Sequence, residues 1–161
     1  MASTSIRIVG VDRLLAKFKN LGEIDMSDAV AKAISPVQGT AIATAPVKDG
    51  HLKGSIKKQV KRKVTGTVEG KVYTNLEYAP YVEFGTGAKG SGTYPFTIKG
   101  KSLSYRTTPW AFPNPDDPTE MIFTNGQVAQ PFMFPALKNN ESKVKKILEK
   151  EYTSELAKAV K

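Results

Sequence analysis

Apolar positions near the N-terminus predict a strand followed by a helix. The alternation at residues 6–10, IRIVG, is typical of a short strand. Asp12 follows, and aspartate is a residue type that caps helices. The apolar residues after it fall on one side of a helix: Leu14, Leu15 and Phe18.

A second helix is predicted over residues 25–45, with Ser27 as its cap. Its apolar positions recur at helical spacing: Val30, Ala33, Ile34, Val37 and Ala41. Pro36 lies inside this stretch and lacks a backbone donor. We therefore expect either a kink or a break, with a new helix starting near Ser35.

Residues 55–74 change to a period of two, which is the repeat of a strand. One face is apolar, with Ile56, Val60 and Val64, and the other carries lysines. Thr65-Gly66 supplies a turn. The pattern predicts an antiparallel hairpin with one apolar and one basic face.

The segment from about 88 to 129 is rich in Gly, Pro, Thr and aromatic residues. Within it, residues 93–108 predict a small hairpin that turns at residues 99–101. A loop of this length in a small domain is usually functional or ordered by a partner. Helical spacing of apolar residues then predicts a C-terminal helix over about 138–160.

These elements predict an α+β fold in a single domain, residues 1–161. We expect an antiparallel β-sheet with two N-terminal helices and a C-terminal helix packed on it, plus a long loop or hairpin insertion at about 88–129.

Composition removes several classes of chemistry. The chain has no cysteine and one histidine, His51, so we expect no disulfide, no metal site and no cofactor. Neither a signal peptide nor a stretch that would cross a bilayer is evident. We expect a soluble protein, made in a cytoplasm, with no membrane partner.

The net charge of +9 and the pI of about 9.6 favour a negatively charged partner. The densest basic block gives the predicted hairpin its basic face: Lys57, Lys58, Lys61, Arg62 and Lys63. This face meets either DNA or an acidic protein. The later lysines alternate with glutamates, which is typical of a solvated helix face.

Glycines at 85, 87 and 90 have the spacing G-x-G-x-x-G. A dinucleotide site requires a helix that opens on the third glycine, and the following residues, SGTYPFTI, do not favour one. The glycines are better interpreted as permissive backbone positions where an ordered segment passes into a mobile loop.

Catalysis is not expected. No serine context resembles a nucleophile elbow, and His51 is interpreted as an exposed turn residue. Glu77 and Glu83 leave two interpretations open: an acid and base pair, or, for Glu83, a buried carboxylate bonded to backbone amides of a loop.

Three motifs follow one another along the chain: TAPVKDGHLKGSI at 44–56, YAPYVEFGTG at 78–87 and QPFMFPAL at 130–137. In this order they resemble the family of small tailed-bacteriophage neck proteins, which includes head-tail connector, tail-component and tail-completion proteins. The first motif departs from the family pattern at Lys48-Asp49, where an acidic residue and threonine are commoner.

The resemblance implies a non-catalytic protein of the virion, located in the neck between head and tail and in the host cytoplasm during assembly. It implies a ring of six or twelve copies that contacts neighbouring neck, portal-side and tail-tube proteins, with possible non-specific contact to DNA in the channel. The alternative is a basic nucleic-acid-binding module, whose affinity for DNA would fall steeply with salt.

The resemblance places the family motif and an interface at these residues: Tyr78, Tyr81, Glu83, Phe84, Gly85, Thr86, Gly87, Pro131, Phe132 and Pro135. Trp110 and Phe112 are candidate interface anchors in the loop, because large aromatic residues are typical hot spots. For the basic face we favour a protein partner, since tight phosphate binding would hinder DNA ejection, and we expect assembly to depend on salt.

Overall fold

The computed structural model describes residues 24–97 and 102–159. The strand predicted at 6–10, the helix predicted after Asp12 and the turn predicted at 99–101 lie outside these residues. The described elements, in chain order, are α2 (Ser27–Thr44), α3 (His51–Ser55), β1 (Lys57–Arg62), β2 (Val68–Tyr73), α4 (Ala79–Phe84), α5 (Gly87–Gly90), β3 (Trp110–Pro113), β4 (Met121–Thr124) and α6 (Met133–Ala159).

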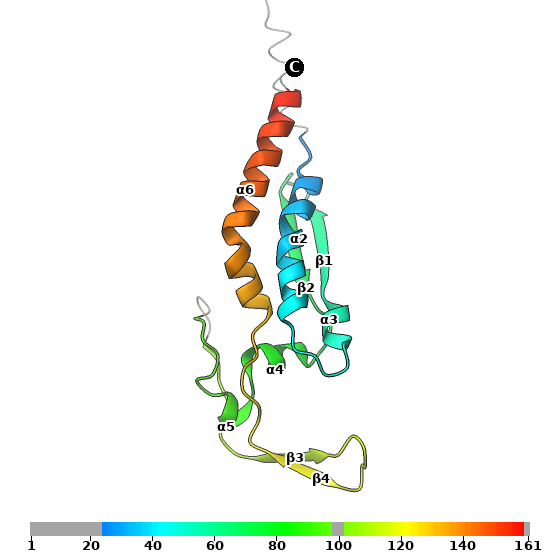
Figure 1. Cartoon of the computed structure of the whole chain (residues 1–161), viewed down its shortest axis with the longest axis vertical. Helices are drawn as coiled ribbons and strands as arrows, with labels where there is room; N and C mark the ends of the chain where they lie inside the picture. The colour runs from blue at the N-terminus through cyan, green and yellow to red at the C-terminus, as the bar shows by residue number, and fades with distance from the viewer. Residues whose placement is uncertain (1–23, 98–101, 160–161) are drawn as a thin grey trace, which may run out of the picture.

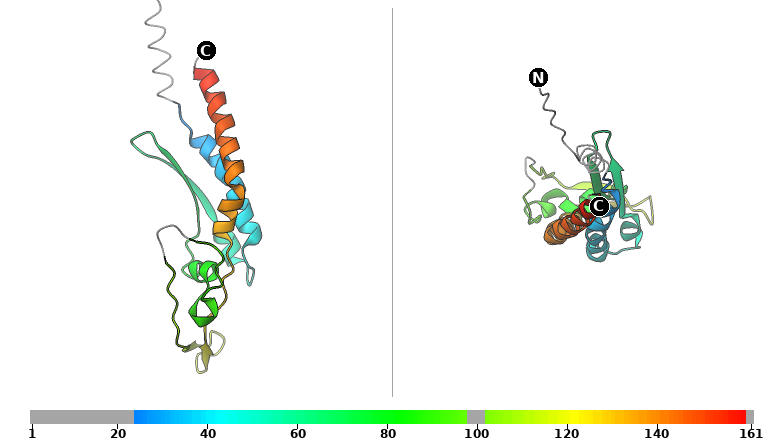
Figure 2. Two further views of the ribbon diagram at one scale, coloured as in Figure 1. Left: turned by 90° about the vertical axis from the view of Figure 1, so that its left-hand side faces the viewer. Right: turned by 90° about the horizontal axis from the view of Figure 1, so that it is seen from above.

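The fold is α+β, as predicted, but its strands form two separate sheets. β1 pairs with β2 and β3 pairs with β4, each antiparallel. The long helix α6 packs along α2, and α2 in turn packs against the β1–β2 hairpin (Figures 1 and 2). The C-terminal helix therefore packs on a helix rather than on a sheet, which corrects the predicted arrangement.

A stripe of small side chains on α2 explains this packing. The buried residues of the helix and its C-terminal neighbour recur every fourth position: Ala29, Ala33, Val37, Ala41 and Ala45. Small side chains allow two helix axes to approach closely. The buried core continues from this stripe into Leu52, Ile56, Phe132 and Ala136.

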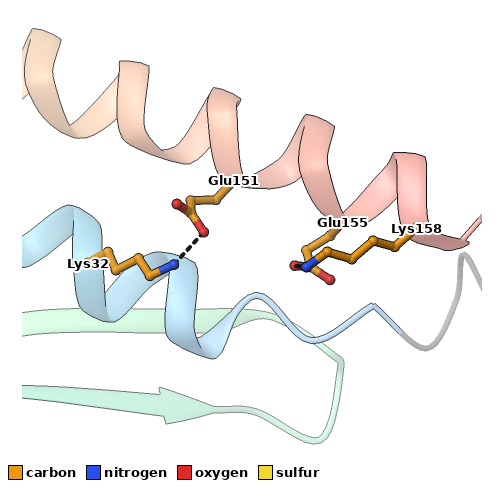
Figure 3. Close-up of polar contacts among 4 residues, drawn as sticks. All are labelled: Lys32, Glu151, Glu155 and Lys158. Atoms are coloured by element: carbon orange, nitrogen blue, oxygen red, sulfur yellow. Dashed lines mark hydrogen bonds and ion pairs between the residues drawn. The ribbon is translucent and has the colours of Figure 1, made fainter.

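Polar contacts along the helix pair fix its antiparallel direction. At one end, the Thr44 hydroxyl lies 3.5 Å from the carbonyl oxygen of Phe132. In the middle, the Asn140 side-chain amide donates to the Thr40 hydroxyl at 2.9 Å. At the far end, Lys32 Nζ lies 2.8 Å from Glu151 Oε2, an ion pair drawn as a dashed line in Figure 3.

Pro36 does not break α2, which is one helix from Ser27 to Thr44. Of the two predicted alternatives, a kink or a break near Ser35, the break is therefore wrong. A proline inside a helix costs about 3 kcal/mol, and packing of α2 between α6 and the β1–β2 hairpin outweighs that cost. Ser27 is also not the cap, because it is the first residue of α2 and Met26 occupies the N-cap position. The Asp25 carboxylate, one residue further out, accepts from the Ser27 backbone N–H at 2.9 Å.

The predicted β1–β2 hairpin is confirmed, with Lys57 opposite Tyr73 and Arg62 opposite Val68. Its turn lies at Thr65-Gly66, as expected, and Gly66 adopts a φ of 81°. Val64 was assigned to the apolar face but is fully exposed, because the ladder ends at Arg62 and the chain then turns away.

The small hairpin predicted at 93–108 is not present in its described residues, which contain no strand. Tyr94 and Phe96 pack their rings against Phe84 and Phe134 instead. The hairpin of this region is β3–β4, which lies at the end of the molecule farthest from the C-terminus (Figure 1).

Candidate functional site

The motif at 78–87 lies at the start of α6, at the junction where α4, the insertion and α6 meet. Its first part is helix α4, which begins at Ala79 and has Pro80 in its first turn, where a missing N–H is tolerated. Its last part, from Gly85, turns out of the helix toward the segment at 125–129. The motif thereby connects α4, the insertion and the C-terminal helix.

Glu83 is the buried acidic residue of this junction, 5% exposed. Its Oε2 accepts hydrogen bonds from the backbone N–H groups of Phe132 at 2.7 Å and Met133 at 2.9 Å, and its Oε1 accepts from Phe134 at 3.1 Å. The next residue, Pro135, has no N–H to satisfy. One carboxylate and one proline thus account for the N–H groups that a helix start leaves without partners.

This arrangement explains why α6 begins at Met133, earlier than the expected residue 138. A carboxylate at a helix N-terminus is favoured by both hydrogen bonding and the helix dipole. The interpretation of Glu83 as a buried carboxylate bonded to backbone amides is confirmed. With both oxygens occupied in this way, and Glu77 exposed, the pair does not form an acid and base site.

Gly85, Thr86 and Gly87 cross the returning chain at close range. Thr86 and Gln127 exchange backbone hydrogen bonds of 2.9 and 3.0 Å. Gly126 has a φ of 97°, and a Cβ there would lie 1.9 Å from the Thr86 carbonyl oxygen. Gly87 also has a positive φ, and a Cβ there would lie 2.3 Å from the carbonyl oxygen of Asn125. Only glycine fits such a crossing.

The crossing corrects the idea of a mobile joint. The permissive angles are present at Gly85 and Gly87, with φ of 75° and 63°, but they permit tight backbone contact rather than motion. Helix α5 also ends at Gly90, whereas a dinucleotide site requires a helix that opens on the third glycine. The structure thus gives no support to a nucleotide cradle here.

An aromatic cluster closes the junction on one side. Phe84 and Tyr94 pack edge to face at 5.0 Å, and Phe96 lies 4.9 Å from Phe134. Burial, followed by the nearby Glu83 carboxylate, raises the pKa of Tyr94 to about 12. Its hydroxyl is buried and has no hydrogen-bond partner among the described residues. Phe132 is fully buried in the core, and Pro131 is half-buried beside it.

The structure brings the expected interface aromatics together in one hollow. Tyr78, Tyr81, Trp110 and Phe112 line a depression of about 600 Å³, which we call the aromatic hollow. Tyr81 remains 59% exposed and Tyr78 41% exposed. Residues from α4 and from the insertion were predicted separately, and the β3–β4 hairpin is what places them side by side.

The five basic residues of the hairpin do not share one face. Lys58 Nζ donates to Ser35 Oγ at 2.6 Å, and Arg62 lies 3.3 Å from Asp25, so both lie toward α2. Lys63 forms an ion pair with Glu69 at 2.9 Å.

Lys57 and Lys61 point away from α2, because strand side chains alternate. The surface on that side, which we call the outer face, is formed by Lys57, Gln59, Lys61, Glu69, Lys71 and Tyr73. Lys57, Lys61 and Lys71 form no ion pair with any residue that the structure describes.

Sequence reasoning missed an apolar groove of about 630 Å³ beside α2. Its walls come from β2, α2 and α6, with Val68, Ile34 and Leu148 among the lining residues. The period-two pattern of β2 indicated an apolar face, but not that α6 would leave part of it uncovered.

Neither metal ligation nor a membrane span is found in the described part of the chain. Within residues 24–97 and 102–159, no group of three or more His, Cys, Asp or Glu side chains is placed to hold a metal ion. None of the described helices is both long and apolar enough to cross a bilayer.

Comparison with known proteins gives a match to a model of a protein family. Neither the curated proteins nor the solved structures contain a significant match to this chain. Residues 12–85 match the family model described as "Bacteriophage HK97-gp10, putative tail-component". That range includes the first motif and most of the second, whereas the motif at 130–137 lies beyond it. Over residues 12–85 the chain is similar to this HK97-gp10-like family of putative bacteriophage tail components, and the resemblance drawn from the first two motifs is confirmed by this match.

Proposed function

We propose that this chain is a ring subunit of the phage neck that joins the DNA-filled head to the tail, in a tail-completion, head-tail joining or tail-terminator role. The family match over residues 12–85 is the observation that carries the proposal. Its partners are other copies of the chain and the neighbouring neck, portal-side and tail-tube proteins, assembled in the host cytoplasm and retained in the virion.

The shape of the subunit supports a ring. Subunits that bind head to tail need two different surfaces on each copy. The elongated molecule offers them: the aromatic hollow and β3–β4 lie at one end, and the β1–β2 hairpin extends toward the other (Figures 1 and 2).

The aromatic hollow is the surface that we assign to a neighbouring virion protein. Exposed Tyr and Trp side chains supply large contact area with little loss of conformational entropy. Tyr81 and Trp110 are available for this because α4 and β3 are held by the backbone crossing at Thr86 and Gln127.

Electron microscopy with a gold-labelled antibody against this chain tests the location. We expect the label at the junction of head and tail in intact virions. Label along the tail tube, at the tail tip, or absent from particles would contradict the proposal.

Non-specific DNA binding is the second candidate, and the outer-face lysines favour it. Lys57, Lys61 and Lys71 carry the free positive charge there. If DNA is the partner, fluorescence anisotropy with a short duplex will show an affinity that falls linearly with the logarithm of salt concentration. Absence of binding at low salt would remove this candidate.

A further inference from the structure

Acidic and basic residues are segregated along this chain. Residues 107–137 contain no Lys or Arg, and their three acidic residues lie close together in the β3–β4 connection: Asp116, Asp117 and Glu120. Residues 50–68 have the opposite composition, with six basic residues and no Asp or Glu. In a chain of net charge +9, residues 114–120 are thus a local negative patch, which we call the acidic turn.

The acidic turn is held in a defined shape. Asp117 Oδ1 accepts hydrogen bonds from the backbone N–H of Thr119 at 3.0 Å and from its hydroxyl at 2.7 Å. The Asn114 side-chain amide lies 3.3 Å from Glu120 Oε2. All three acidic residues are exposed, and none forms an ion pair with a residue that the structure describes.

Apolar side chains lie next to the acidic turn on the side facing away from the aromatic hollow. The pairing of Trp110 with Thr124 places Trp110 and Phe112 on the hollow side. Met121 and Phe123 alternate to the opposite side and are 53% and 79% exposed. A hairpin of two strands is marginal in water, so a contact that covers this side would stabilise it.

We propose that the acidic turn of one copy binds the outer face of the β1–β2 hairpin of the next copy. This contact rests on the proposed ring and names the surfaces that form it. Asp116 and Glu120 of one copy lie against Lys57 and Lys71 of the next. The same contact buries the exposed side chains of Met121 and Phe123. β3–β4 and the tip of the β1–β2 hairpin lie at opposite ends of the molecule (Figure 2), and the two hairpins belong to separate sheets.

The test uses matched charge reversals in the purified full-length chain. The arm variant carries Asp116→Lys and Glu120→Lys. It keeps Asp117, which accepts two hydrogen bonds within the turn, and loses only the bond of 3.3 Å from Asn114 to Glu120. The sheet variant carries Lys57→Glu and Lys71→Glu, which lie opposite Tyr73 and Gln59 and so create no directly opposed like charges. Circular dichroism checks that each variant is folded.

Sedimentation velocity over a range of concentrations measures self-association. We expect the wild-type chain to associate, and each variant alone to associate at least about tenfold more weakly. The chain carrying both pairs of reversals should regain association, since its charges are again complementary. An equimolar mixture of arm and sheet variants should also regain association. The unchanged turn of the sheet variant is complementary to the unchanged sheet of the arm variant, and the two reversed surfaces are complementary to each other.

A control pair, Lys143→Glu with Lys146→Glu on the exposed side of α6, changes net charge as the sheet variant does and should associate normally. Failure of the double reversal to restore association, unchanged association in both variants, or a wild-type chain that stays monomeric would each overturn the proposed contact. A sheet variant that loses only DNA binding would assign the outer face to DNA. The proposed function is tested separately, by the position of the chain in virions.

Discussion

The backbone N–H of Phe132 donates to the carboxylate of Glu83 at 2.7 Å, and this bond joins α4 to the start of α6 across 49 positions of sequence. The same carboxylate accepts hydrogen bonds from the backbone N–H groups of Met133 and Phe134. The family-type motif at 78–87 and the Pro-Phe motif at 130–137 are therefore two halves of one helix cap.

Glu83→Gln should destabilise the protein. The amide keeps one acceptor oxygen but loses the charge, and its NH₂ group faces backbone donors. Hydrogen bonds to charged groups contribute about 1.5–3 kcal/mol, so we expect a loss of about that size in the free energy of unfolding, measured by urea denaturation. Glu77→Gln is the matched control at an exposed position and should change it by less than about 0.5 kcal/mol. Equal midpoints for the two variants would refute the cap.

Gly126→Ala should disrupt the backbone crossing. The new Cβ would lie 1.9 Å from the Thr86 carbonyl oxygen at a positive φ, so we expect a cost of about 2–5 kcal/mol. Gly39→Ala is the control in open space on α2, and should stabilise the protein by about 0.5–1 kcal/mol. Thermal unfolding followed by circular dichroism compares the two variants. We expect the melting temperature to fall for Gly126→Ala and to rise for Gly39→Ala.

Tyr94→Phe should stabilise the protein, or at least leave its stability unchanged. The Tyr94 hydroxyl is buried with no partner among the described residues, so its removal relieves a desolvation cost of about 1–3 kcal/mol. Tyr105→Phe is the contrasting variant, because the Tyr105 hydroxyl donates to the Phe84 carbonyl oxygen at 2.9 Å. Tyr105→Phe should lower the free energy of unfolding by about 1 kcal/mol, because it removes this hydrogen bond. A larger loss for Tyr94→Phe than for Tyr105→Phe would contradict this account of the cluster.

The ion pair between Lys32 and Glu151 should make stability depend on pH at both extremes. The hydrogen bond from Lys32 lowers the pKa of Glu151 from its ordinary 4.5, so this stabilisation is present above that value and is lost as pH falls through the lowered pKa. Glu151 likewise raises the pKa of Lys32 from 10.5, so the contribution is present below 10.5 and is lost as pH rises through the raised pKa.

Urea midpoints of the wild type and of Glu151→Gln, measured from neutral pH to pH 3, test the acid limb. Their difference should be small, because both side chains are partly exposed, and should shrink as the pH falls below 4.5. A difference that stays constant over this range would show that the ion pair contributes nothing to stability.

Local patterns predicted those parts of the fold that local forces determine. The β1–β2 hairpin and α2 follow from period-two and helical spacing. The break expected at Pro36 is absent, because helix propensity is a weak prior that packing of α2 between two layers can override. The start of α6 could not be read locally, since its cap is supplied by Glu83 from α4.

The candidate site shows the same division. Tyr78, Tyr81, Trp110 and Phe112 were identified from residue type, but that they share one hollow depends on how β3–β4 folds back. The hairpin of the insertion was predicted at 93–108, where Tyr94 and Phe96 instead fill a cluster with Phe84. The basic face was predicted as one surface, although Lys58 and Arg62 lie toward α2.

The central claim is that this chain joins head to tail, and electron microscopy of lysates tests it most directly. The phage carries a nonsense codon in this gene and is grown in a nonsuppressing host, with a suppressing host as the control. We predict DNA-filled heads lying beside unattached tails in the first host, and intact virions in the second. Intact, infectious virions in both hosts would contradict the claim.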